Sequence, residues 1–175
     1  RGGNGYIEDW VNSRLVRDAH LGVLWEGTSN INALDVTTRA IAKAGAHKAL
    51  SDSLQDLTAN TPDIPGQFRG TLQLAAERAL TMAEEIATSG NETMARKASD
   101  ALYHVTSASL LAREAAQLGT QNQDARRLIL ARMVIDHRLS PQDPLAIPQD
   151  EDPITVALLA QRKVSLAEAQ ELVAN

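Results

Sequence analysis

The sequence contains no cysteine, which excludes disulfide bonds, thiolate metal sites and cysteine nucleophiles. Aromatic residues make up only 3% of the 175 residues. Alanine and leucine dominate instead, and this favours helices. No apolar run approaches the roughly 20 residues of a membrane span, and no segment has the composition of a secretory signal peptide. We therefore expect a cytoplasmic protein that has no membrane partner.

The hydrophobic and charged fractions, 43% and 22%, are those of an ordinary globular domain with its own core. The net charge of −5 gives no overall attraction to nucleic acid. Five arginines nevertheless lie on or just before one predicted helix, where they could form a nucleic-acid patch: Arg113, Arg126, Arg127, Arg132 and Arg138. Because Asp124 and Asp136 are interleaved with them, we predict a solvated face or an ion-pair network, and no nucleic-acid partner.

Helical periodicity runs through most of the chain. Apolar residues recur at three- and four-residue steps from Met94 to Leu118, which is the pattern of a packed bundle helix. Gly119 is placed to end that helix, and Ser29 or Asn30 is placed to cap an earlier one. No strand or internal repeat is evident. We predict an all-α fold, an antiparallel helical bundle joined by short loops.

Breaks between the helices are marked by glycine and proline. Residues 21–29 contain Gly22 and Gly27 and are predicted to form a loop, and residues 59–66 and 139–153 form linkers. Ser165 and Glu168 have the spacing of a capping box that opens the last helix. The other predicted helices cover residues 8–20, 29–44, 46–58, 67–88, 92–118, 123–138 and 154–161.

Glu26 is the candidate reactive group. It lies between bulky Trp25 and Gly27, and an apolar ligand that covered it would disfavour the charged form of its carboxyl. A carboxylate whose charged form is disfavoured has a raised pKa and is a better base near neutral pH. Gly27 permits close approach of a ligand. On the residues alone, an exposed glutamate in a loop remains the alternative.

Three motifs in the first 31 residues resemble, in order and at nearly the right spacing, the C-terminal signature of acyl-CoA dehydrogenases. They are the glycine turn from Gly2 to Tyr6, the run from Arg14 to Ala19, and the loop from Trp25 to Ile31. The turn is not a dinucleotide-binding fingerprint, since Glu8 occupies the place of the third glycine. Departures from the family pattern include Asn30 where many members carry glutamine.

The resemblance implies a role for each matching residue. Glu26 corresponds to the base that removes the α-proton of an acyl-CoA, while FAD accepts the β-hydride. Gly27 corresponds to a residue of the substrate site. Arg17 corresponds to a fixed position that we interpret as structural. The residues that correspond to FAD contacts are Thr28, Ser29 and Asn30, and Gly2 and Gly3 correspond to a turn near the flavin of a neighbouring subunit.

We predict three regions on this basis. Residues 1–44 would form the C-terminal part of the catalytic helical domain, 45–138 a helical-bundle extension, and 139–175 a proline-rich arm with a terminal helical hairpin. We interpret the chain as a fragment, inactive by itself, of an enzyme that binds an acyl-CoA and forms a homo-oligomer. The residues do not identify its electron acceptor.

Two alternatives stay open. The extension also resembles that of a bacterial subgroup that includes flavoproteins induced by DNA alkylation damage, which points to DNA or partner binding. The other alternative is a helical interaction domain in which the motif is vestigial. A metal site is not expected, because the histidines are far apart and none has ligand spacing: His20, His47, His104 and His137.

Overall fold

The computed structural model describes residues 2–25, 27–121, 123–140, 143, 145, 152–160 and 162–174. Every regular element among these residues is helical, which confirms the all-α prediction for the described part of the chain. The α-helices are α1 (Val11–Leu24), α2 (Ser29–Asp35), α3 (Ala46–Ala59), α4 (Gly66–Ser89), α5 (Ala95–Thr120), α6 (Arg126–Val134), α7 (Pro153–Leu159) and α8 (Leu166–Ala174).

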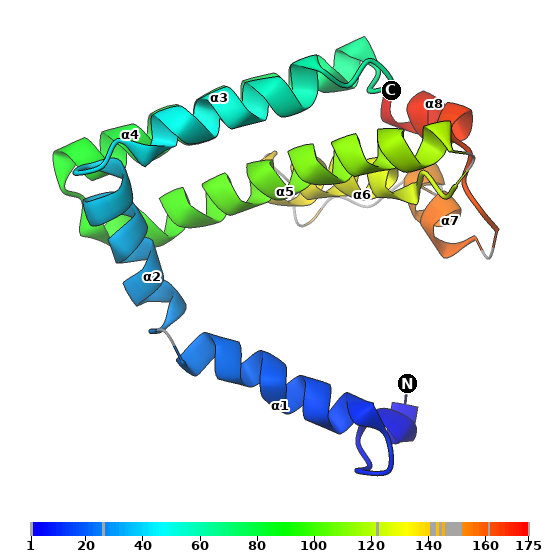
Figure 1. Ribbon diagram of the computed structural model, residues 1–175, viewed down its shortest axis with the longest axis horizontal. Helices are drawn as coiled ribbons and strands as arrows, with labels where there is room; N and C mark the ends of the chain where they lie inside the picture. Colours follow the sequence, from blue (N-terminus) through cyan, green and yellow to red (C-terminus); the bar gives the residue numbers. More distant parts are fainter. Residues whose placement is uncertain are drawn as a thin grey trace.

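Helices α3 to α6 lie side by side, and successive helices run in opposite directions (Figure 1). The turn between α4 and α5 depends on Gly90, which has a φ of 66°, a conformation that costs glycine little. Its backbone N–H donates to the carbonyl of Ile86, as in a common helix ending. The turn between α3 and α4 is held by Arg69, which donates to the carbonyls of Thr61 and Ile64 at 3.0 and 2.9 Å.

Two apolar clusters form the core, and small residues let the helices approach closely. One cluster gathers around Phe68 and Leu128, where α4, α5 and α6 meet α8. The other gathers around Leu54 and Val105, where α3 packs on α4 and α5. The predicted stripe of α5 is confirmed, because each of its members is buried or half-buried. Alanines on α4 and α5 supply much of both clusters, so the chain builds its core with few aromatic side chains.

Two helices widen into π-helical turns, η2 (Val36–Ile41) and η4 (Ile135–Leu139). In η2 the hydroxyls of Thr37 and Thr38 both donate to the carbonyl of Leu34, at 3.2 and 2.7 Å. Hydroxyls that bond backbone carbonyls in this way compete with the regular helical ladder and bend it. The two threonines also interrupt the apolar spacing of residues 29–44 in the sequence.

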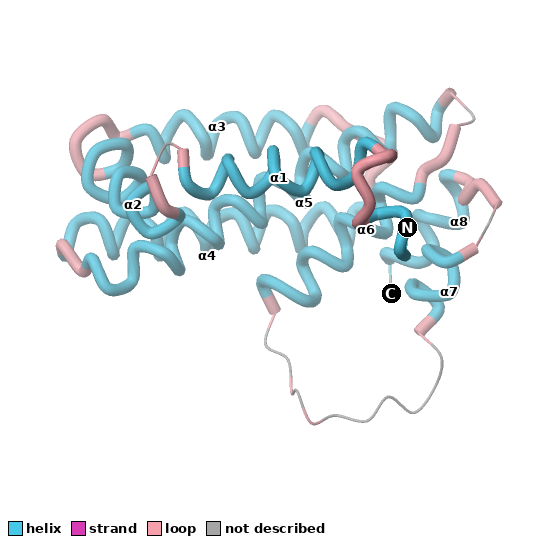
Figure 2. The backbone as a smooth tube through the Cα atoms, turned by 90° about the horizontal axis from the view of Figure 1, so that it is seen from below, coloured by secondary structure: helices cyan, strands magenta, loops and turns pink. Residues whose placement is uncertain are grey.

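The N-terminal arm, which we define as residues 2–25 and which includes η1 (Gly2–Gly5) and α1, stands away from the bundle in Figure 1, and Figure 2 shows α1 running along the length of the bundle. Helix α2 joins it to the bundle by packing on α5. The predicted first helix is displaced: α1 begins at Val11 and continues to Leu24, through the first four residues of the segment predicted as a loop. Gly22 does not break it, because a lone glycine costs a helix only about 1 kcal/mol.

Several predicted boundaries are wrong in detail. Gly119 does not end α5, which continues to Thr120, and Gly119 instead lies beneath Leu166 of α8. Ser29 and Asn30 do not cap α2, because Thr28 occupies the N-cap position and its side chain makes no capping hydrogen bond. The Ser165 hydroxyl does accept from the N–H of Glu168 at 3.2 Å. Most of the predicted arm at 139–153 lies outside the described residues.

Within the part of the chain that the structure describes, none of the helices combines the length and the apolar character needed to span a bilayer.

Candidate functional site

The glycine turn lies at the far end of the arm. Gly2 and Gly3 are exposed in η1, and a Cβ added at either would meet no atom within 4 Å. Helix α1, whose 14 residues extend about 21 Å at 1.5 Å per residue, separates this turn from the loop that begins at Gly27. Within one chain, therefore, the structure does not bring Gly2 and Gly3 together with the other candidate site residues.

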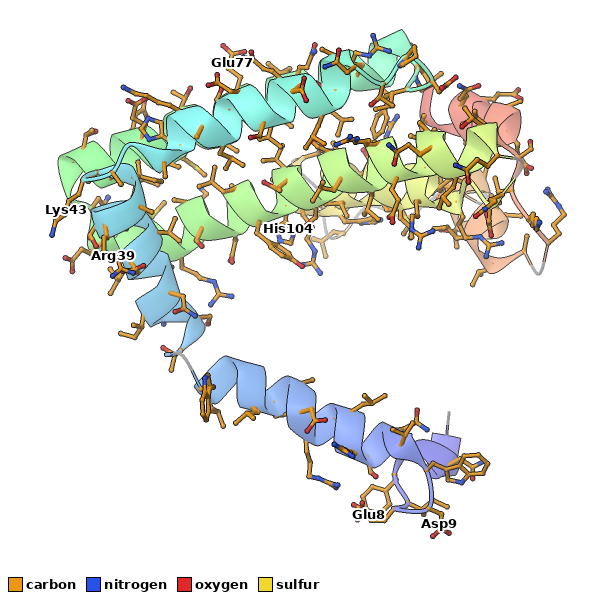
Figure 3. The ribbon with its side chains drawn as sticks, in the orientation of Figure 1. Glu8, Asp9, Arg39, Lys43, Glu77 and His104 are labelled. Atoms are coloured by element: carbon orange, nitrogen blue, oxygen red, sulfur yellow. The ribbon has the colours of Figure 1, made fainter. Side chains whose placement is uncertain are left out.

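Arg17 folds the start of the arm onto α1. Its guanidinium donates two hydrogen bonds to the carboxylate of Glu8, at 2.6 and 3.2 Å, and the Ser13 hydroxyl donates to the same carboxylate at 3.2 Å. The paired guanidinium holds the pKa of Glu8 below its usual value. Figure 3 shows Glu8 at the end of the arm that is remote from the bundle. This contact supports the structural interpretation of Arg17.

Glu26, the predicted base, lies outside the described residues. Its neighbour Gly27 is described and has a φ of 95°, in a region that residues with a side chain rarely adopt. A Cβ at Gly27 would also lie 3.2 Å from Cγ2 of Ile31. The Asn32 amide donates a long hydrogen bond of 3.4 Å to the Gly27 carbonyl, which weakly stabilises the turn. Glycine is therefore required here by the backbone as well as by space.

Thr28, Ser29 and Asn30 are consecutive at the start of α2, where the helix leaves its first N–H groups without helical partners. The side chains of Thr28, Ser29 and Asn30 are all exposed. The Ser29 hydroxyl oxygen accepts a hydrogen bond from Arg96 of α5. A hydroxyl that accepts one bond can still donate its proton, so Ser29 remains able to donate to a ligand.

Arg96 is a positioning residue that the sequence reasoning missed. It also forms an ion pair with Asp100 of α5, with 2.8 Å between Nε and Oδ1, which fixes the guanidinium that reaches Ser29. The two bonded residues are 67 positions apart in the sequence. No local pattern could have indicated this contact, because only the packing of α2 on α5 brings the two side chains together.

The arginines of the predicted patch are largely occupied within the protein. Arg126 donates to the carbonyls of Ala160 and Arg162 at 2.8 and 2.7 Å, between α7 and α8. Arg132 bonds Asp136 and also the carbonyl of Val173 in α8. Arg127 pairs with Glu114 at 2.9 Å. These contacts agree with the predicted ion-pair network and show that two of the arginines also hold the C-terminal hairpin.

Two grooves flank α4. One, of about 710 Å³, lies between α3 and α4 and contains an ion pair between His47 and Glu84, with 3.4 Å between Nε2 and Oε1. The other, of about 1050 Å³, lies between α4, α5 and η4, and His104 is among its lining residues (Figure 3). Among the described candidate residues, Gly2, Gly3 and residues 27–30 line neither groove, whereas Arg96 lines the second. Among the described residues, no three His, Asp or Glu side chains are grouped as metal ligands.

A comparison with known proteins found a similar sequence. The chain is 29% identical over 92 residues to a protein of Caenorhabditis elegans named acyl-CoA dehydrogenase family member 11. The matched residues make up 53% of this chain but only 15% of that protein, so the chain corresponds to a small part of its relative. No family model matches the sequence, and no solved structure matches it.

The match is too long to lie within the signature alone. A stretch of 92 residues is longer than the 44 residues in which the motifs lie, so it necessarily includes part of the helical bundle. The bundle therefore shares sequence with a protein named as an acyl-CoA dehydrogenase, and the similarity to this family does not rest on the three motifs alone.

Proposed function

We propose that this chain is a C-terminal helical part of a flavin-dependent acyl-CoA dehydrogenase that converts an acyl-CoA thioester into its α,β-unsaturated product. The observation that carries the proposal is the ordered set of three motifs in residues 2–31. The 92-residue similarity to acyl-CoA dehydrogenase family member 11 supports it independently, because that similarity reaches into the bundle.

In the proposed reaction Glu26 removes the α-proton of the bound thioester. The backbone N–H of the same residue donates to the thioester carbonyl and thereby acidifies the α-carbon. FAD, when bound, supplies the acceptor for the β-hydride. Gly27 has no side chain of its own, so its backbone can approach the substrate closely.

The described residues are compatible with flavin contact at the start of α2. Ser29 keeps a free O–H donor although its oxygen accepts from Arg96, and Asn30 presents an exposed amide. Gly2 and Gly3 lie about 21 Å away along α1. We propose that this turn serves the flavin of a neighbouring subunit in a homo-oligomer, which removes the need for both ends of the arm to reach one cofactor.

The alternative, a binding module for DNA, receives less support from the structure. Arg126, Arg127 and Arg132 are engaged by carboxylates and carbonyls of the chain itself. A surface that binds the phosphate backbone needs arginines and lysines that are free to replace its counterions.

A chimera tests the proposed role of Glu26. Residues 1–44 would replace the corresponding segment of an acyl-CoA dehydrogenase that binds flavin, and bleaching of the flavin absorbance by acyl-CoA would be measured. We expect bleaching with Glu26 and its loss, by at least 100-fold in rate, with Glu26→Gln. Asp9→Asn in the same chimera, at an exposed carboxylate, is the control and should bleach normally.

The flavin content of each chimera distinguishes a chemical effect from misfolding. A Glu26→Gln chimera that holds flavin but is not bleached supports the proposal, whereas one that bleaches at the normal rate contradicts it. We expect the isolated chain to retain no FAD, because its candidate contacts are exposed and lie at the two ends of α1. A flavin band that stays with the isolated chain through gel filtration would refute that part.

A further inference from the structure

The groove between α3 and α4 has the composition of a binding site, although none of the candidate dehydrogenase residues lines it. It lies between residues 47–59 of α3 and 72–84 of α4, has a volume of about 710 Å³ and reaches down to Ser109 of α5. Small-molecule sites are concave spaces of about 300–1,000 Å³ that combine apolar walls with a few directed polar groups. We call this space the α3–α4 groove.

The floor of the α3–α4 groove is apolar. Leu54 of α3 and Leu72 of α4 are buried, and Ala76, one turn from Leu72 on the same helix, has only a methyl group. Carbon atoms of a ligand that covered these side chains would leave water for an apolar surface, which is favourable. The floor therefore suits the aliphatic part of a ligand.

Two buried hydroxyls in the groove are restricted to accepting hydrogen bonds from a ligand. Ser109 donates to the carbonyl of Val105 at 2.9 Å, and Thr58 donates to the carbonyl of Leu54 at 3.1 Å. Since a hydroxyl has one proton, each oxygen has only lone pairs left to offer. A polar ligand group that reaches either oxygen must carry an N–H or O–H.

Carboxylates dominate the rim. Asp52 of α3 and Glu77 and Glu84 of α4 line the groove, together with one lysine, Lys48. In Figure 3, Glu77 lies beside α3 at the edge of the bundle. Glu84 is paired with His47, whereas the carboxylates of Asp52 and Glu77 form no ion pair within the described part of the chain. The rim therefore favours a cation.

His47 adds a buried nitrogen that has no partner. Its side chain is only 11% exposed, and Nε2 lies 3.4 Å from Oε1 of Glu84. Nδ1 is buried, and no described residue bonds it. A proton on Nδ1 would be a buried donor without an acceptor, whereas a proton on Nε2 faces the Glu84 carboxylate. Nδ1 is therefore an acceptor, and an N–H donor that enters the groove and meets the turned imidazole would satisfy it.

The acceptors are spread along the groove. Glu77 and Glu84 are two turns apart on α4, which corresponds to about 10.5 Å at 1.5 Å per residue. Asp52 lines the opposite wall, on α3. Among the described residues, no three His, Asp or Glu side chains surround one point as metal ligands. This arrangement fits an elongated cation that carries several N–H donors.

We propose that the α3–α4 groove binds a linear aliphatic polyamine, which is a carbon chain that carries several ammonium groups. The carbon chain covers Leu72 and Ala76 on the floor. The ammonium groups pair with Asp52 and Glu77 on the rim, and their remaining N–H groups donate to the acceptors of the groove. This site is separate from the proposed flavin chemistry, so neither proposal depends on the other.

Calorimetric titration of the full chain with spermidine tests the proposal. We expect one spermidine to bind per chain, and putrescine, which is too short to reach from Glu77 to Glu84, to bind at least about fivefold more weakly. Asp52→Asn should weaken spermidine binding about fivefold, because it removes one exposed ion pair. Asp56→Asn is the matched control, since it makes the same change one turn along α3 at a residue outside the groove. It should weaken binding by less than about twofold.

Two further measurements distinguish the groove from general attraction between charges. Ala76→Leu leaves the charge unchanged but fills the floor, and it should weaken binding by at least about tenfold. Circular dichroism and urea denaturation confirm that this variant is folded. In the unmodified chain, spermidine should shift the amide resonances of Thr58 and Ser109, whereas that of Leu128 in the core of α6 should stay constant.

Three results would overturn the proposal. Spermidine could fail to bind at millimolar concentration, Asp56→Asn could weaken binding as much as Asp52→Asn, or the shifted amides could lie away from the α3–α4 groove. The second result would mean that the net charge of −5 attracts the polyamine without a defined site. Unchanged binding to a folded Ala76→Leu variant would also place the polyamine elsewhere.

Discussion

The arm and the bundle are both helical, but different interactions stabilise them. In the bundle, each of α3 to α6 buries one face against its neighbours, and side chains such as Leu72 and Val105 have no exposed surface. On the arm, Leu24 is 73% exposed and the ordered contacts are mainly polar ones between Glu8, Ser13 and Arg17. Since isolated helices of about 14 residues are marginal in water, the arm depends on a partner in a way that the bundle does not.

The largest expected effect comes from one substitution made in both regions. Leu72→Ala in the bundle core should lower the free energy of unfolding by about 2–5 kcal/mol, because it leaves a cavity that the packed helices cannot fill. Leu24→Ala on the arm should change it by no more than about 0.5 kcal/mol. Urea denaturation followed by circular dichroism measures both, at a concentration at which the chain is monomeric. Equal losses would show that the arm is packed in solution and that the contrast is wrong.

A smaller effect tests the docking of α8 on α5. Gly119→Ala places a Cβ 2.9 Å from the Cβ and Cδ1 of Leu166, so it should destabilise the protein by about 1–3 kcal/mol. Gly70→Ala is the matched control in α4, where an added Cβ meets nothing within 4 Å. That control should stabilise the protein by up to about 1 kcal/mol. We predict that the two substitutions change the free energy of unfolding in opposite directions. Urea denaturation followed by circular dichroism measures both changes.

The patterns that were predicted correctly from sequence are those set by local periodicity. The α5 stripe and the break after α3 both have signals within a few residues of the feature, whereas the widened turn at Thr37 and Thr38 was not predicted. Gly119 was misread because its role is set by Leu166, which lies 47 positions further along the chain. A glycine that ends a helix and a glycine that admits a second helix give the same local pattern.

In the candidate site, too, some features follow from local sequence and others depend on how the helices pack. The motif order predicted which residues to examine, and the need for glycine at position 27 follows from its own positive φ, which Thr28 beside it does not have. The contact from Arg96 to Ser29 could not be predicted, because it depends on how α2 packs on α5. The proposed role of Glu26 stays a prediction, since it lies outside the described residues.

Two neighbouring arginines of α6 are expected to differ in how strongly they stabilise the protein. Arg126→Lys removes a guanidinium that donates to two carbonyls between α7 and α8, and it should cost about 1–2 kcal/mol because the lysine ammonium, on a stem of different shape, does not place its donors where Nη2 lies. Arg127→Lys alters an exposed pair with Glu114 and should cost about 0.5 kcal/mol or less. Amide hydrogen exchange of α8 measures the difference. Equal exchange in the two variants would indicate that Arg126 does not hold the hairpin.

The smallest effect is a local transition of the arm in acid. The hydrogen bond from Arg17 holds the pKa of Glu8 below its usual value in the folded protein. A carboxyl with a lowered folded-state pKa stabilises the fold above its unfolded pKa and loses that contribution as the pH falls through the lowered value. We therefore expect the connection between the glycine turn and α1 to loosen below about pH 4.

Amide chemical shifts of Ser13 and Arg17, followed from pH 6 to pH 2, report this transition at the site itself. In the Glu8→Gln variant the two amides should show no such step, and they should resemble those of the acid form at every pH, since the amide cannot form the charged pair. Shifts of Leu72 in the bundle should stay constant over the upper part of this range, because its surroundings are apolar. If the arm and the bundle titrate together, the arm is not an independent unit, and its polar contacts are coupled to the core.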